Sequence, residues 1–88
     1  MMFHLLIEKQ AINEMKHIPY KDQNHIKQKI KEILPKNPFP SGHGDIKKIK
    51  GSNFLRLRVG DYRIFFDVDN KEKKVYILSV KHRSKAYR

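Results

Sequence analysis

The 88-residue chain contains no cysteine, and this absence excludes several classes of chemistry at once. The protein has no disulfide framework, no thiol nucleophile and no cysteine-ligated zinc site. The composition fits a reducing cytosol, where disulfides are rare. We also expect no metal or other cofactor, because the five histidines form no ligand pair such as His-x-x-x-His.

Long apolar runs are also missing. The apolar stretch at residues 1–7 is interrupted by His4, and it is too short for a signal-peptide core or a membrane span. We therefore expect a soluble, cytoplasmic protein with no membrane partner. The short length and the lack of a long linker predict a single domain over residues 1–88.

Acidic residues are scarce. The chain has 20 Lys and Arg against nine Asp and Glu, a net charge of +11. Residues 1–46 hold seven cations and five acids (net +2), whereas residues 47–88 hold 13 and four (net +9). The excess indicates a polyanionic partner: nucleic acid, an anionic membrane or an acidic protein. General solubility is the alternative. All five arginines lie in the second half, and arginine suits bidentate contacts with phosphate.

The apolar pattern predicts an α+β fold: an N-terminal strand, a two-helix hairpin, and then antiparallel strands in a small twisted sheet. We expect a mostly buried strand over 2–7, helices over 8–18 and 21–34 with Pro19 between them, and a Pro- and Gly-rich loop over 35–45. A weak strand over 46–50, strands over 54–59 and 62–68, a turn over 69–74 and a strand over 75–80 follow.

The segment 54–66 reads as a β-hairpin around Gly60-Asp61. Glycine in the first position of a two-residue loop suits a type II′ turn. This register pairs Arg58 with Arg63 and Arg56 with Phe65, because side chains alternate along each strand. The apolar side chains then share the opposite face, which the two helices can cover. That face holds Leu55, Leu57, Val59, Tyr62, Ile64 and Phe66.

Two arginines directly opposite each other destabilise a strand pair by a few tenths to about 1 kcal/mol. A bound phosphate would convert this repulsion into shared hydrogen bonding. The alternative is an ordinary solvated sheet face, which often carries Lys and Arg. The basic tail after the last strand can fold back over the same face. It would bring further polar groups there: Lys81, His82, Arg83, Lys85 and Tyr87.

These residues resemble the RelE/ParE superfamily, the toxins of type II toxin–antitoxin pairs. The resemblance covers nearly the whole chain. It is carried by the element order, Ile46-Lys-Lys-Ile-Lys-Gly51, the Arg-Leu-Arg-Val-Gly-Asp-Tyr-Arg segment at 56–63, and Val80-Lys-His-Arg83 followed by Tyr87. Members similar to RelE cut messenger RNA in the ribosomal A site, and members similar to ParE inhibit DNA gyrase. The sequence is closer to RelE.

The resemblance implies a metal-independent, ribosome-dependent endoribonuclease that inhibits translation. It implies catalytic positions at Arg56, Arg63, Arg83 and Tyr87, and a phosphate contact at Arg58. The reaction is attack of an RNA 2′-OH on the adjacent phosphate, which needs charge stabilisation, a base and an acid. Tyr87 either acts as the base or stacks on an RNA base, and His82 is an alternative proton carrier unless strand alternation turns it away.

Further basic residues either bind RNA or are simply solvated. They are Lys47, Lys48 and Lys50, with Lys81, His82 and Lys85 in the tail. The expected partners are the ribosome, messenger RNA and an acidic, partly disordered antitoxin. A ParE-like gyrase inhibitor without enzymatic activity, and an inactive RNA-binding homologue, are the competing hypotheses.

Overall fold

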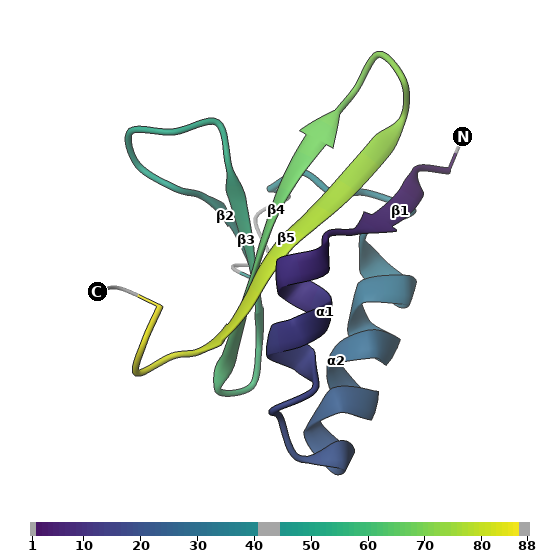
Figure 1. The fold of residues 1–88 in the computed structure, drawn as a ribbon. Coiled ribbons are helices and arrows are strands. Elements are labelled where there is room, and N and C mark those ends of the chain that lie inside the picture. The colour runs from purple at the N-terminus through teal and green to yellow at the C-terminus, as the bar shows by residue number, and fades with distance from the viewer. Residues whose placement is uncertain (1, 41–44, 87–88) are drawn as a thin grey trace.

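The computed structural model describes residues 2–40 and 45–86, which form a sheet layer and a helix layer (Figure 1). The strands are β1 (His4–Ile7), β2 (Ile46–Lys48), β3 (Leu55–Val59), β4 (Tyr62–Asp69) and β5 (Lys74–His82). The helices are α1 (Lys9–Met15) and α2 (Tyr20–Ile33), and both lie on one face of the sheet. The α+β order predicted from the sequence is confirmed.

The five strands follow the order β1-β5-β4-β3-β2 in one sheet. Strands β2 to β5 pair antiparallel in sequence order, whereas β1 pairs with β5 in parallel, from His4 opposite Lys74 to Ile7 opposite Ile77. A parallel neighbour requires a long crossover connection, which the two helices and the strands after them provide. The first and the last strand of the chain therefore lie side by side.

The prediction that the first strand is mostly buried was wrong. Leu6 is 41% exposed and Ile7 is 46% exposed. The cause is the position of β1 at the end of the strand order, where it has a strand neighbour on one side only. Its apolar composition therefore contributes to the surface as well as to the core.

The first helix is shorter than predicted, and the second agrees closely. Helix α1 ends at Met15 and not at residue 18; Pro19, as the N-cap of α2, separates the two helices. In α2 the side chains of Ile26 and Ile30 are buried one turn apart, as the apolar spacing predicts. The described part of the expected 35–45 loop contains no helix or strand, and residues 41–44 lie outside the described residues. Neither helix is long and apolar enough to cross a membrane.

The core lies between the helices and the apolar face of the sheet. Five of the six side chains predicted for that hairpin face are buried, and Tyr62 is half-buried. Residues of α1, α2, β2 and β5 complete the core, with Leu34 directly after α2. The buried hydrophobic residues are Ala11, Met15, Ile26, Ile30, Leu34, Ile46, Leu55, Leu57, Val59, Ile64, Phe66, Val75, Ile77 and Val80.

The tight β3–β4 turn depends on Gly60, whose φ is +56°, while Asp61 keeps a negative φ. This combination matches the predicted type II′ turn. A Cβ at Gly60 would meet no atom within 4 Å, so the cost of Gly60→Ala is confined to the backbone. We expect this change to lower the free energy of unfolding by about 1–2 kcal/mol in denaturant titrations. Asp61→Ala in the same turn is the control, with an expected loss below about 0.5 kcal/mol.

Candidate functional site

The hairpin register places two arginines directly opposite each other on the face away from the helices. Arg58 pairs with Arg63, and Arg56 pairs with Phe65, as predicted. The sheet continues this surface on one side, because Lys47 of β2 pairs with Arg56. The backbone therefore concentrates positive charge on one face of β2, β3 and β4.

Three arginines from separate elements line one pocket of about 500 Å³, which we call the arginine pocket. Arg58 comes from β3, Arg63 from β4 and Arg83 from the segment after β5. Helix α2 supplies part of the wall. The complete lining is His25, Lys29, Ile33, Asp45, Arg58, Val59, Gly60, Arg63 and Arg83.

Arg63 lies at the electrostatic centre of this group. Burial, together with the positive charges of Arg56, Arg58 and Arg83, lowers its pKa from the ordinary value, and Asp61 opposes the shift. Its Nη1 donates hydrogen bonds to the carbonyl oxygens of Gly60 (3.1 Å) and Tyr62 (3.0 Å). Its Nε is buried and has no hydrogen-bond partner among the described residues. A guanidinium group crowded by other cations is suited to receive an anion, because the anion relieves their repulsion.

The positive charges of Arg58 and Arg83 are only weakly neutralised by two nearby carboxylates. Arg58 Nη2 lies 3.4 Å from Asp45 Oδ1, and Arg83 Nε lies 3.8 Å from Asp61 Oδ1. All four side chains are about half exposed or more, so these ion pairs contribute little stability. The backbone does more to position the arginines, because the Arg83 N–H donates to Asp61 O (2.7 Å) and the Arg58 N–H to Asp45 O (2.8 Å).

Arg56 lines a second basic pocket of about 310 Å³, the lysine pocket, on the β2 side of the sheet. The tail reaches it through Ala86, and Phe65 forms part of its wall. The structure thus brings the three predicted RNA-binding lysines of the 46–51 segment to Arg56. The full lining is Lys47, Lys48, Ile49, Lys50, Arg56, Phe65 and Ala86.

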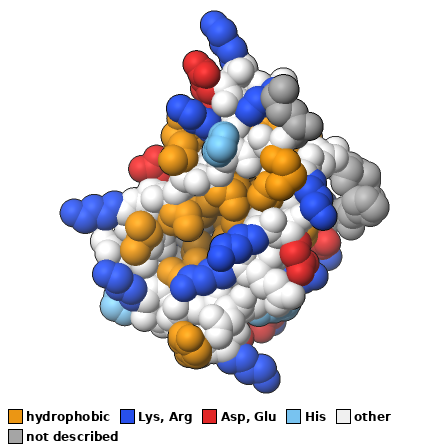
Figure 2. All heavy atoms as spheres, turned by 90° about the vertical axis from the view of Figure 1, so that its right-hand side faces the viewer, with side chains coloured by type: hydrophobic (Ala, Val, Ile, Leu, Met, Phe, Trp, Pro, Cys, Tyr) orange, Lys and Arg blue, Asp and Glu red, His pale blue; other side chains and the backbone are white. Residues whose placement is uncertain are grey.

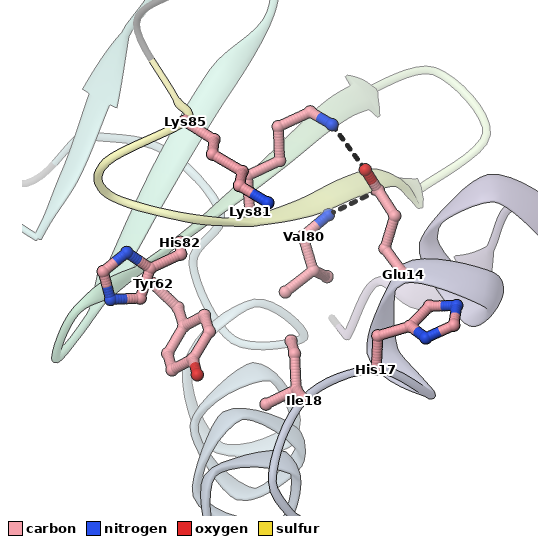
Figure 3. A pocket seen from close by; sticks show the side chains of 8 residues that line it. All are labelled: Glu14, His17, Ile18, Tyr62, Val80, Lys81, His82 and Lys85. Carbon is pink, nitrogen blue, oxygen red and sulfur yellow. Dashed lines mark hydrogen bonds and ion pairs between the residues drawn. The ribbon is translucent and has the colours of Figure 1, made fainter.

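The other predicted tail residues lie elsewhere. Lys81, His82 and Lys85 line a helix-side pocket of about 370 Å³ together with Glu14, His17, Ile18, Tyr62 and Val80 (Figure 3). The His82 ring packs edge-on against Tyr62, at 5.4 Å between centroids, which agrees with the expectation that strand alternation turns it away from the arginines. Lys81 Nζ binds Glu14 Oε2 at 2.5 Å. Of the predicted tail residues, the described part of the chain brings Arg83 alone to the arginine pocket.

Comparison with known proteins identifies the family. Residues 5–87 match the family model described as "ParE toxin of type II toxin-antitoxin system, parDE". The chain belongs to the RelE/ParE family of type II toxins. It is 32% identical to the putative toxin RelE1 of Methanocaldococcus jannaschii over 100% of this chain and 98% of that protein. It is 36% identical to toxin RelE3 of the same organism, over 94% and 93% respectively.

The fold comparison agrees with this assignment. The RelE–RelB complex of Pyrococcus horikoshii contains a chain that superposes on this one with a TM-score of 0.79 at 29% identity. The match covers 98% of this toxin and 100% of that chain. The family resemblance seen in the sequence, with its RelE-like character, is therefore confirmed.

Two residues of the site were not predicted from the toxin's sequence, and one predicted residue cannot be placed. His25 and Lys29 of α2 line the arginine pocket but were not predicted, because their proximity to the arginines depends on how α2 docks. Their spacing of four residues places them on one helix face, which was the only local signal. The predicted catalytic residue Tyr87 lies outside the described residues.

Glu14 is the main acidic anchor of the helix-side pocket. Burial raises its pKa, but hydrogen bonds from Lys81, Ser79 and Val80 outweigh burial, so the pKa lies below its ordinary value of 4.5. A depressed carboxylate pKa stabilises the folded toxin above about pH 4.5, and this stabilisation is lost as the pH falls through the folded-state value.

We therefore expect Glu14→Gln to lower the free energy of unfolding by about 1–3 kcal/mol at pH 7. The difference from the wild type should shrink as the pH falls toward 3. Denaturant titrations of both proteins at a series of pH values measure it. Glu32→Gln is the matched control, because its partner Lys29 is 3.8 Å away and both side chains are exposed. A difference that stays constant with pH would show that the Glu14 charge is not responsible.

Proposed function

We propose that this toxin is a ribosome-dependent endoribonuclease that cuts messenger RNA and so inhibits translation. The observation that carries the proposal is the convergence of Arg58, Arg63 and Arg83 on one pocket. Three guanidinium groups in one pocket can hold the oxygens of a single phosphate through paired hydrogen bonds. Such a pocket also stabilises the extra negative charge that a phosphate acquires when a 2′-OH attacks it.

The roles of the arginines follow from their places. Arg63 is central, because the positive charges of Arg56, Arg58 and Arg83 all act on it, so we assign it as the principal donor to the reacting phosphate. Arg83 and Arg58 complete the charge around the same phosphate. Arg56 lies in the lysine pocket, where it and Lys47, Lys48 and Lys50 hold neighbouring phosphates of the RNA. Phe65 in that pocket can stack on a base.

Proton transfer requires other groups, because the side chain of arginine stays protonated at any pH near neutral. Tyr87 is the candidate that the family resemblance supplies. His25 is a second candidate, since it lines the arginine pocket and an imidazole ring can both accept and donate a proton. His82 is less suitable than the sequence suggested, because it lines the helix-side pocket.

An antitoxin is the proposed protein partner. Several related solved structures are toxin–antitoxin complexes, among them the RelE–RelB complex of Pyrococcus horikoshii. Figure 2 shows hydrophobic side chains gathered on the side of the molecule that holds β1 and the helices. An apolar hollow of about 280 Å³ lies there, lined by Ile7, Ile12, Met15, Lys16, Gln23 and Lys27. An antitoxin segment with apolar and acidic side chains would cover this hollow and its lysines.

Mapping of transcript ends tests the nuclease proposal. We expect purified toxin, added to a cell-free translation system, to produce new ends in a translated message. The same message without a start codon should stay intact, because cleavage depends on the ribosome. Inhibited translation with intact messages would contradict the proposal.

Gyrase inhibition is the second candidate, because the matching family model is that of ParE toxins. A DNA supercoiling assay with the same protein preparation distinguishes the two. Loss of gyrase activity without RNA cleavage would favour the ParE-like function, and RNA binding without either effect would indicate an inactive homologue.

A further inference from the structure

Glu14 of α1 accepts hydrogen bonds from three consecutive residues of β5. Its Oε1 accepts from Ser79 Oγ at 2.7 Å and from the Val80 backbone N–H at 3.0 Å, and its Oε2 binds Lys81 Nζ at 2.5 Å. Figure 3 shows the Glu14 side chain reaching from the helix to the strand, with dashed lines to Val80 and Lys81. The carboxylate is therefore fixed by donors of three different kinds.

The Glu14 carboxylate binds where the edge of β5 has no neighbouring strand in the described part of the chain. Strand β1 pairs with β5 only as far as Ile77, and the Glu8 N–H donates to Ile77 O just beyond that pairing. Past this point α1, and not a strand, lies along β5. Without Glu14 the Val80 N–H would have no acceptor there, and a buried N–H without an acceptor is costly. Glu14 thus occupies the open edge of β5 at the point where the basic tail begins, from Ser79 to Lys81.

The Lys81 side chain starts on one face of the sheet, and its ammonium group binds on the other. Lys81 pairs directly with Arg63, so its Cβ leaves the sheet on the same face as the Arg63 side chain. Its ammonium group nevertheless binds Glu14 and lines the helix-side pocket. The cations that lower the pKa of Arg63 are Arg56, Arg58 and Arg83, and Lys81 is not among them. Lys81 is also missing from the lining of the arginine pocket.

We propose that Glu14 is a positioning residue that withholds Lys81 from the arginine pocket, so that the Lys81 ammonium group does not compete there with the guanidinium groups for the RNA phosphate. The lysine that does line this pocket, Lys29, comes from α2 and pairs with Glu32 at 3.8 Å. Guanidinium offers a planar fork of donors, whereas ammonium is a compact point charge that would compete for the same phosphate oxygens. Released from Glu14, Lys81 can reach the phosphate from its position opposite Arg63. This inference rests on the proposed function, since it assumes that the arginine pocket binds single-stranded RNA.

The experiment measures the salt dependence of binding to a short single-stranded RNA oligonucleotide. Glu14→Gln keeps an oxygen for Ser79 and Val80 but removes the charge that holds the Lys81 ammonium. We expect it to tighten binding at low salt and to steepen the plot of log K against log salt by about 0.7, the increment for one added phosphate contact on a single strand. Lys81→Met should bind as the wild type does, because Lys81 is withheld in the wild type.

The double variant Glu14→Gln/Lys81→Met provides the decisive comparison. Its salt slope should return to the wild-type value, because the released ammonium is gone. Ser79→Ala is the structural control: it removes one donor to Glu14 but keeps the Lys81 pair, so the slope should not change. Circular dichroism and thermal melts of every variant confirm that the compared proteins are folded.

The outcomes separate this inference from the proposed function. An unchanged slope in folded Glu14→Gln, or the same steepening in the double variant, would overturn the role of Glu14 while RNA binding stands. If the wild type does not bind the oligonucleotide, or if Arg63→Ala leaves its binding unaltered, the arginine pocket does not bind free single-stranded RNA and this inference fails. The proposed function is judged separately, by the mapping of transcript ends in a translated message.

Discussion

Arg63→Ala is expected to reduce messenger RNA cleavage by about 10²–10³-fold, the usual cost of removing one charged or polar donor from a transition state. Arg63 faces Arg58 across the hairpin and lines the same pocket as Arg83. Its depressed pKa reflects burial and the neighbouring cations. A residue under such repulsion contributes most when an anion is present, so its loss affects the transition state more than the free toxin.

The stability of this variant should change by less than about 1 kcal/mol, because two effects oppose each other. The change relieves the repulsion across the hairpin, and it also removes the hydrogen bonds from Arg63 to Gly60 O and Tyr62 O. Arg63→Lys keeps the charge but loses the planar fork, and it should retain only part of the activity. Cleavage rates with translated message, combined with denaturant titrations, measure both quantities.

Lys71→Ala is the matched control for Arg63→Ala. It also removes one cation, but from the exposed turn between β4 and β5. It should leave cleavage within about twofold of the wild type, because distant surface charges are largely screened at physiological salt. Equal losses in the two variants would mean that net charge matters and not the arginine pocket. Full cleavage by Arg63→Ala would remove Arg63 from the mechanism.

Phe66→Ala is expected to lower the free energy of unfolding by about 3–5 kcal/mol. Phe66 is completely buried, and it lies between Leu55 of β3 and Ile77 of β5 in the sheet register. Truncation leaves a cavity beneath the helices that the rigid sheet cannot close. In a domain of this size each kcal/mol corresponds to about 4–8 °C in Tm, so the melting temperature should fall by more than 10 °C.

Phe54→Ala tests whether burial is the cause. Phe54 is also a phenylalanine near β3, but its side chain is 45% exposed. Its truncation should cost less than about 1 kcal/mol, because it leaves no enclosed cavity. Thermal melts and denaturant titrations of the two variants side by side give the comparison. Similar losses would show that Phe66 is not the centre of the core.

Local sequence pattern was sufficient for the hairpin. Leu57, Val59 and Ile64 alternate with Arg56, Arg58 and Arg63, and Gly60-Asp61 marks the turn. Alternation and turn together leave one register that buries the apolar set, and that register is the one observed. Helix α2 was equally predictable, since Ile26 and Ile30 repeat at the helical period.

Interactions between distant segments were not predictable in this way. The exposure of Leu6 and Ile7 follows from the edge position of β1, which is set by its pairing with β5 about 70 residues later. The positions of the tail residues were predicted only in part. Arg83 reaches the arginine pocket, but Lys81 is turned to α1 by Glu14, 67 residues away in sequence.

The sequence by itself determined the element order, the apolar and basic faces of the hairpin and the family. All three depend on short patterns, and each pattern is made of residues that are close together along the chain. Only the tertiary structure decided which cations share a pocket. A side chain as long as lysine can leave its strand toward either face, so the position of a charge depends on the acceptor that another element supplies. Here α1 supplies Glu14 for Lys81, and α2 brings His25 to the arginines.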